Sequence, residues 1–91
     1  MRLDIFLKLS RLCPRRSLAQ TLCDAGLVLL NDRPVKSAHN VKIDDVITIR
    51  RRDRETAARV LKVPDKPNVS RADSKELVEV ISEKHFELDN L

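Results

Sequence analysis

Apolar residues near the start of the chain recur at the spacing of a helix face. Leu3, Phe6 and Leu7 follow the i, i+3, i+4 rule, which predicts a short amphipathic helix with its apolar side against a core. Pro14 ends this segment, because proline removes a backbone donor and clashes with the preceding turn. Proline is tolerated in the first turn of a helix, so the same residue can open a second one.

The second predicted helix carries its own apolar stripe. Leu18, Leu22 and Ala25 recur at i, i+4 and i+7, which predicts that these three side chains are buried. Gly26, the single glycine of the chain, comes directly after them. A glycine at this place favours a left-handed C-cap, because it has no side chain to oppose a positive φ.

After Gly26 the pattern changes to β-prone runs. These runs predict strands at residues 27–30, 46–49 and 57–63. A short helix remains the alternative for the last of them. Asn31 and Asp32 predict a tight turn into residues 33–35, and Asp44 and Asp45 predict a second turn after a loop at 36–42.

Charge is unevenly distributed along the chain. The 91 residues include 18 Lys and Arg and 14 Asp and Glu, for a formal net charge of +4. Residues 1–63 hold 14 basic and 7 acidic side chains, whereas residues 64–91 hold 4 and 7. Prolines at 64 and 67 mark the boundary. We therefore predict a basic domain at 1–63, of a kind that favours polyanion binding, and a partly ordered acidic extension at 64–91.

The extension contains one clear local signal. Ser70 followed by Asp73 is typical of a helix N-terminus, where the hydroxyl accepts from a backbone N–H three residues on. Residues 77–81 fit either a helix or a strand.

Composition excludes several classes of protein. One glycine is too few for a P-loop or a dinucleotide-binding fingerprint. Two aromatic residues, both Phe, are too few for the base-stacking platforms of RRM or OB-fold proteins. The longest uncharged apolar stretch, at 25–30, is far too short to span a membrane, and no signal peptide is recognisable. A cytoplasmic protein that does not contact membranes is expected.

The cysteines and histidines do not form a metal or redox motif. Cys13 and Cys23 are ten positions apart, and His39 and His85 add no ligand spacing. Two reduced thiols packed as small apolar groups are expected, with no metal and no cofactor. No serine lies in a recognisable nucleophile motif, so we do not expect an enzyme.

Basic side chains gather at the two predicted helices. Five lie within the first 16 residues, opposed by Asp4 alone: Arg2, Lys8, Arg11, Arg15 and Arg16. Arg15 and Arg16 stand near the start of the second helix, where a cation opposes the helix dipole at a cost of a few tenths of a kcal/mol. An anion bound there, most naturally a phosphate, would meet guanidinium groups and helix-terminal amides together. The alternative for this pair is solvated surface charge.

Several of these residues resemble the S4 RNA-binding domain in order and in spacing. The matching positions are Arg2-Leu3-Asp4, Ser10-Arg11-Leu12, Arg15-Arg16-Ser17-Leu18-Ala19, Gly26, Asn31, Val35 and Val41-Lys42 before Asp45. The match covers about residues 1–50, and its continuation to residue 63 suits the small stand-alone members of the family. The resemblance implies an α+β fold of the S4 (alpha-L) type, with two N-terminal helices packed on a small, bent, mostly antiparallel sheet.

The resemblance also implies binding to structured RNA by the helical face and the adjoining loops. The positions that match the family here are Arg2, Lys8, Arg11, Arg15, Arg16 and Gln20. Asp4 matches as well, but a carboxylate repels phosphate, so we expect it to orient a neighbouring arginine. Asn31 and Gly26 match positions that serve turn geometry. We expect three further cations to extend the surface along the turns: Arg33, Lys36 and Lys42.

The chain departs from the family pattern at two places. Asp44 stands where the family usually has glycine, and a positive φ there costs aspartate roughly 1 kcal/mol. Leu27 stands where a basic residue often follows the glycine, and Arg33 is a possible substitute. The chain also has an additional basic cluster, made of Arg50, Arg51, Arg52 and Arg54. Two interpretations of this cluster stay open: it contacts RNA, or it is a solvated set of charges that protects an edge strand from pairing.

Among the small members, the resemblance implies a non-enzymatic factor that binds a large ribosomal subunit carrying a stalled peptidyl-tRNA. Such a factor contacts ribosomal RNA and tRNA while a partner adds a C-terminal alanine tail, and it is a monomer when free. The alternatives are heat-shock-type recycling of aborted subunits without tailing, a generic structured-RNA module, or a protein-interaction module that docks through residues 70–91. A helix-turn-helix DNA binder is disfavoured, because the second helix is poor in Asn and Gln for base readout.

Overall fold

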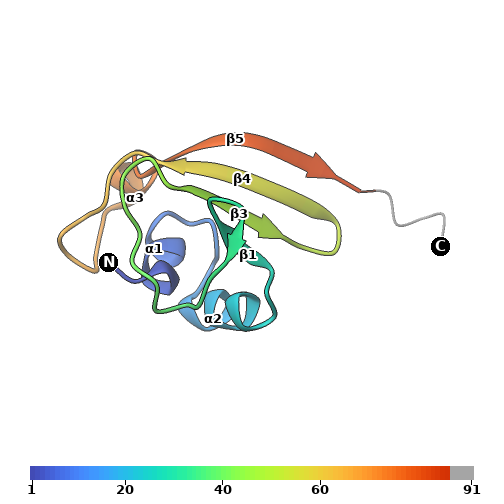
Figure 1. Cartoon of the computed structure of the whole chain (residues 1–91). Coiled ribbons are helices and arrows are strands. Elements are labelled where there is room, and N and C mark those ends of the chain that lie inside the picture. Colours follow the sequence, from blue (N-terminus) through green and yellow to red (C-terminus); the bar gives the residue numbers. More distant parts are fainter. Residues whose placement is uncertain (87–91) are drawn as a thin grey trace.

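Two helices lie together on one side of an antiparallel sheet in the computed structural model, which describes residues 1–86 (Figure 1). The helices are α1 (Leu3–Leu9) and α2 (Arg16–Asp24). The sheet has the strand order β2-β1-β3-β4-β5. Its strands are β1 (Val28–Leu30), β2 (Arg33–Pro34), β3 (Val46–Arg50), β4 (Arg54–Val60) and β5 (Val78–His85). A single-turn helix, α3 (Arg71–Ser74), precedes β5. The predicted fold class is confirmed.

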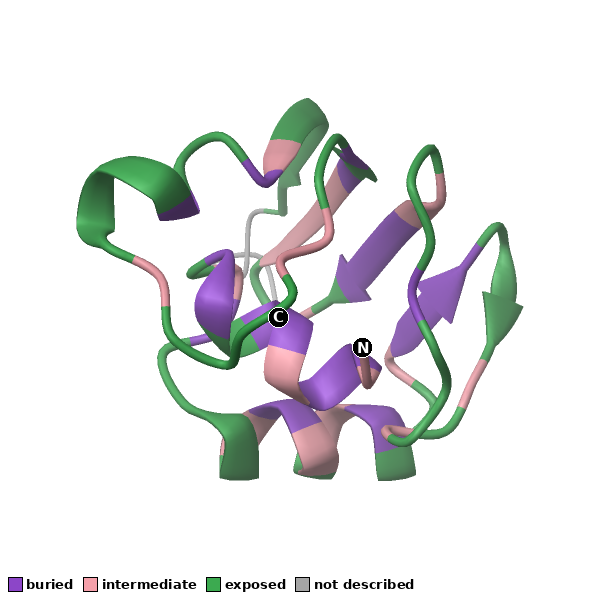
Figure 2. Ribbon diagram, turned by 90° about the vertical axis from the view of Figure 1, so that its left-hand side faces the viewer, coloured by how far each residue is buried: buried purple, intermediate pink, exposed green. Residues whose placement is uncertain are grey.

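The core lies between α1 and the strands that face it. Leu3, Phe6 and Leu7 are all completely buried, as the helical spacing predicted. They pack in one cluster with apolar residues of the sheet, among them Val28 and Ile47. Figure 2 shows the buried positions running through α1 and the central strands. Each large apolar side chain in such a place contributes about 1.5–3 kcal/mol of burial free energy.

The apolar stripe predicted on α2 is partly wrong. Ala19 and Cys23 are the buried residues of this helix, while Leu18 and Leu22 are half-buried and Ala25 is exposed. The helix ends at Asp24, so Ala25 is already its C-cap. Small side chains on the buried face let α2 approach α1 closely, which leaves the larger leucines at the rim of the contact.

Gly26 ends α2 in the predicted left-handed conformation, with φ +74°. Its N–H donates to the Cys23 carbonyl, and the N–H of Leu27 donates to the Leu22 carbonyl, both at 3.0 Å. These two bonds form a Schellman motif, which satisfies carbonyls that the helix end would otherwise leave open.

The two predicted turns are confirmed, and a shared side chain links them. Asn31 and Asp32 both have positive φ, 52° and 68°, as the type I′ turn of the β1–β2 hairpin requires. Asp44 has φ +73°, so this aspartate adopts the positive φ for which the family usually has glycine. The Asn31 side chain accepts from Val46 N at 2.9 Å and donates to Asp45 Oδ1 at 3.0 Å. Asn31 therefore serves turn geometry, as expected.

Residues 57–63 and 77–81 both contribute to strands. Residues 57–60 of the first stretch lie in β4, which already begins at Arg54, whereas residues 61–63 lie outside the strand. The second stretch, which the sequence left open, begins β5 at Val78. The two strands pair antiparallel from Arg54 opposite His85 to Val60 opposite Val78. Beside α3, the Ser70 hydroxyl accepts from the Asp73 N–H at 3.1 Å, which confirms the predicted N-cap.

The chain beyond residue 63 takes part in the packing. Leu77 is 3% exposed and belongs to the core cluster. The division into a domain at 1–63 and an extension at 64–91 stays a prediction, and residues 87–91 of that extension lie outside the described residues. Within residues 1–86, none of the helices has the length and apolar character that crossing a bilayer requires.

Candidate nucleic-acid interface

A buried carboxylate organises the basic side chains of the two helices. Asp4 is completely buried, and its oxygens accept five hydrogen bonds. Arg2 donates from Nε to Oδ1 and from Nη2 to Oδ2, both at 3.1 Å. Arg16 Nε and Gln20 Nε2 donate to Oδ2 at 3.1 and 2.9 Å, and Ile5 N donates to Oδ1 at 2.8 Å. We call Asp4, Arg2, Arg16 and Gln20 the Asp4 cluster.

The environment keeps Asp4 charged. Burial raises the pKa of a carboxyl group, but the hydrogen bonds from Gln20, Arg2, Arg16 and the Ile5 N–H outweigh burial and lower the pKa of Asp4 to about 2. The cluster thus holds one negative and two positive charges at neutral pH. Because the arginine side chains are 42% and 46% exposed, part of each guanidinium faces solvent while the carboxylate does not.

The loop before β3 fixes the start of α1 and, with it, Asp4. Arg2 forms an isolated antiparallel bridge with Asn40. The Leu3 N–H donates to the His39 carbonyl at 2.8 Å, and the Asp4 N–H donates to the Ser37 carbonyl at 3.1 Å. These amides belong to the first turn of α1, where a helix itself offers no acceptor. The loop supplies the acceptors and so sets the direction of the helix.

The cations at the start of α2 have different surroundings. Arg15 is the N-cap, is exposed and gives no side-chain cap, whereas Arg16 is the first helical residue and pairs with Asp4. Asp4 therefore offsets the unfavourable interaction of Arg16 with the helix dipole. This geometry agrees with the expectation that Asp4 orients a neighbouring arginine. Asp4 in fact holds two arginines, Arg2 and Arg16.

The remaining predicted site residues lie outside the Asp4 cluster. Lys8 is exposed on α1, and Arg11 follows the end of that helix with φ +63°. Three cations lie exposed on β2 and in the loop between β2 and β3: Arg33, Lys36 and Lys42. The structure therefore brings Arg2, Arg16 and Gln20 together through Asp4, and the other predicted residues take no part in this cluster.

Sequence reasoning missed the structural role of Arg51. Its Nη2 donates to the Leu12 carbonyl at 2.7 Å and approaches Cys13 Sγ at 3.9 Å. The interpretation of residues 50–54 as an edge guard is wrong, because β3 and β4 are interior strands of the sheet. The bond from Arg51 joins the β3–β4 hairpin to the α1–α2 connection, and no local pattern indicates it.

Both cysteines are free thiols in the core. Burial raises the pKa of Cys13, although Arg51 opposes that shift. Burial also raises the pKa of Cys23 to about 11, with smaller effects in the same direction from Cys13, Asp4 and Asp24. Across residues 1–86, His, Cys, Asp and Glu side chains form no group of three that could hold a metal ion.

Comparison with known proteins identifies the family of the segment that contains the Asp4 cluster. A family model of the S4 domain matches residues 1–47, which include the whole Asp4 cluster. The chain belongs to the S4 domain family. Over 87 residues this S4 protein is 33% identical to the RQC P-site tRNA stabilizing factor of Streptococcus pneumoniae, covering 96% of its own length and 97% of the relative. The resemblance to small stand-alone members is therefore confirmed.

One further sequence relative and two solved structures are also similar to this chain. The Bacillus subtilis factor of the same name is 46% identical over 50 residues, or 55% of this chain and 58% of the relative. The trimeric structure of Vibrio cholerae heat shock protein 15 superposes with a TM-score of 0.78 at 28% identity, covering 90% of this S4 protein and 82% of that chain. A solution structure described as a hypothetical protein gives a TM-score of 0.78 at 32% identity, with coverage of 90% and 98%.

Proposed function

We propose that the protein binds the large ribosomal subunit when a stalled peptidyl-tRNA remains on it, and contacts both ribosomal RNA and tRNA. The Asp4 cluster carries the proposal, because a buried carboxylate holds Arg2 and Arg16 with part of each guanidinium facing solvent. Relatives named for stabilising a P-site tRNA support tRNA as the partner.

The contribution of the protein in this role is positional. Contacts to phosphate fix the register of a protein on RNA without reading its sequence. Arginines already ordered by Asp4 lose less side-chain entropy on binding than free ones. The factor acts without catalysing a reaction, as a monomer when free and in the cytoplasm, and it supports a partner that adds a C-terminal alanine tail to the stalled chain.

The test is an affinity pulldown from cells with mildly stalled translation, followed by sequencing of the bound RNA. We compare the wild type with an R2A/R15A/R16A variant. A matched control, R71A/K75A/K84A, removes the same charge from exposed positions on α3, its C-cap and β5. We expect large-subunit RNA and tRNA with the wild type and the control, and their loss with the first variant. Enrichment of small-subunit RNA, or of no RNA, would reject the proposal.

Heat-shock-type recycling without tailing is the second candidate, favoured by the structural likeness to heat shock protein 15. The two roles differ in whether alanine tails on stalled nascent chains depend on the protein. Deleting the protein removes alanine tails from stalled nascent chains under the first proposal, whereas under the second it leaves the tails and increases the fraction of large subunits still carrying tRNA.

A further inference from the structure

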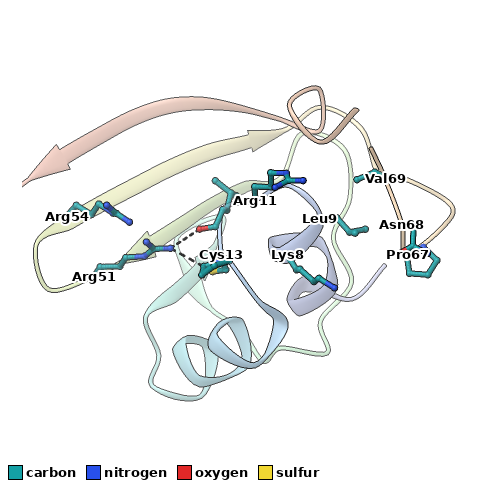
Figure 3. A pocket seen from close by; sticks show the side chains of 11 residues that line it. Lys8, Leu9, Arg11, Cys13, Arg51, Arg54, Pro67, Asn68 and Val69 are labelled. Carbon is teal, nitrogen blue, oxygen red and sulfur yellow. Dashed lines mark hydrogen bonds between the residues drawn. The ribbon is translucent and has the colours of Figure 1, made fainter. Parts of the chain in front are cut away.

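A cationic hollow lies where the end of α1, the β3–β4 hairpin and residues 67–69 meet (Figure 3). It is open to solvent, with a volume of about 640 Å³. We call it the basic pocket, after its four cationic lining residues: Lys8, Arg11, Arg51 and Arg54. Within residues 1–86, neither an acidic side chain nor any residue of α2 belongs to the lining. The lining contains no residue of the Asp4 cluster, although it includes Pro14, which directly precedes the α2 N-cap Arg15.

Two of its guanidinium groups are held by neutral acceptors. Arg11 Nε donates to the Ser74 hydroxyl at 3.1 Å, and Ser74 is 1% exposed. Arg51 Nη2 donates to the Leu12 carbonyl at 2.7 Å, as Figure 3 shows. A carboxylate would cancel part of the positive charge, but a hydroxyl and a carbonyl fix the side chain and leave its full charge in place. Arg11 also adopts a positive φ of 63°, a conformation that arginine takes only at a cost.

The other two cations line the pocket without ion pairs. Among residues 1–86, the ion pairs include neither Lys8 nor Arg54. Figure 3 shows Arg51 and Arg54 extending from the hairpin toward the α1–α2 connection. Four like charges around one hollow repel one another, although Glu83 lines an adjoining hollow with Arg11, Arg51 and Arg54 and offsets part of the charge. A bound anion would relieve the remaining repulsion. A phosphate group suits the lining, because its oxygens accept the paired N–H donors of a guanidinium fork.

We propose that the basic pocket binds a phosphodiester segment of an RNA backbone, separately from the Asp4 cluster. The inference rests on the proposed function only in taking RNA as the partner. An open hollow with four distributed charges fits a chain of phosphates that passes through it. The protein then contacts RNA at two surfaces, which lets it hold two segments in a fixed relation.

The experiment removes charge from the pocket without removing its structural bonds. In K8Q/R54Q both substituted side chains lack ion pairs, whereas Arg11 and Arg51 keep their contacts. The matched control K75Q/K84Q has the same net charge, with both changes at exposed positions. A 12-base-pair RNA duplex is titrated into each ¹⁵N-labelled protein at several salt concentrations, and the arginine Nε–H signals are followed by NMR. Inorganic phosphate is titrated in parallel.

We expect the duplex to shift the signals of Arg51 and Arg54 in the wild type. K8Q/R54Q should bind about tenfold more weakly at low salt, and its log–log salt slope should be shallower by about 1.4–1.8 for two lost phosphate contacts. The control should stay within about twofold of the wild type. Equal weakening in both variants, or shifts at Arg2 and Arg16 alone, would overturn the proposal.

Inorganic phosphate distinguishes the source of the ligand. Binding of free phosphate as tight as that of the duplex would replace an RNA site by a small-anion site and so overturn the inference. Failure of the proposed function gives a different result: wild-type protein that does not pull down large subunits, yet still binds the duplex through Arg51 and Arg54.

Discussion

Replacing Asp4 by asparagine tests the organisation of the interface. The substitution keeps the shape of the side chain but removes the charge, and it turns one of two acceptor atoms into a donor. If the amide oxygen takes the Oδ2 position, the amide NH₂ group faces the N–H of Ile5 and Nε of Arg2, which donate to Oδ1 in the wild type. Two hydrogen bonds are lost, and the other three lose their charged acceptor.

The pKa of Asp4 gives the size of the effect. A shift from 3.8 to about 2 is worth about 2 kcal/mol, at 1.36 kcal/mol for each pH unit. Because the folded pKa is the lower one, this stability is fully present above the unfolded pKa and is lost as pH falls through the folded value. About half of it remains at pH 3. Protonated Asp4 resembles asparagine, so the difference between wild type and D4N should shrink in the same way.

Urea unfolding followed by circular dichroism measures the difference. With a slope of about 1 kcal/mol per molar urea for a chain of this size, the D4N midpoint should lie about 2 M below that of the wild type at pH 7. At pH 3 the gap should be about half as large. E79Q is the control, because it breaks an exposed ion pair with Arg59 and should cost less than about 1 kcal/mol. A D4N deficit that is equal at pH 7 and pH 3 would refute the electrostatic account.

Three further substitutions or reagents probe the frame of the interface. G26A should cost about 1 kcal/mol of unfolding free energy, since φ is +74° but no atom crowds the added methyl group, and a larger loss with disturbed NMR signals in α2 would contradict this. Ellman's reagent should label Cys13 and Cys23 only in denaturant, because both thiols are buried with raised pKa values, and rapid labelling of folded protein would show otherwise. R51A should lower the unfolding free energy by about 1 kcal/mol through loss of its bond to the Leu12 carbonyl, whereas R52A, at an exposed neighbour, should leave it unchanged in the same urea titration.

Elements that depend on nearby residues were predictable from the sequence. The spacing of Leu3, Phe6 and Leu7 gave the buried face of α1, and Gly26 gave the end of α2. Each depends on residues within one or two helical turns, where backbone sterics and side-chain periodicity decide the outcome. The buried face of α2 was mispredicted because it depends on how closely a second helix approaches, which periodicity within one helix does not report.

The contacts of the candidate site also differ in whether they depend on nearby residues or on packing between distant segments. Arg2 and Asp4 are two positions apart, so their pairing follows from the start of one helix. Arg16 lies 12 positions from Asp4 and reaches it only because α2 packs on α1. Arg51 is 39 positions from Leu12, and its bond depends on the whole chain path between the helices and the β3–β4 hairpin. Residues 50–54 are all charged, and the sequence has no feature that marks Arg51 as the residue that binds the Leu12 carbonyl.

The two cationic surfaces also differ in what they can contribute to RNA binding. In the Asp4 cluster one carboxylate lies among two guanidinium groups, so the net charge is small but the direction of each arginine is fixed. In the basic pocket four cations face one hollow without an acidic neighbour in its lining. Long-range attraction and salt dependence grow with net charge, whereas geometric precision grows with the number of fixed donors. If both surfaces bind RNA, the basic pocket therefore supplies most of the electrostatic attraction, and the Asp4 cluster sets the orientation in which the complex forms.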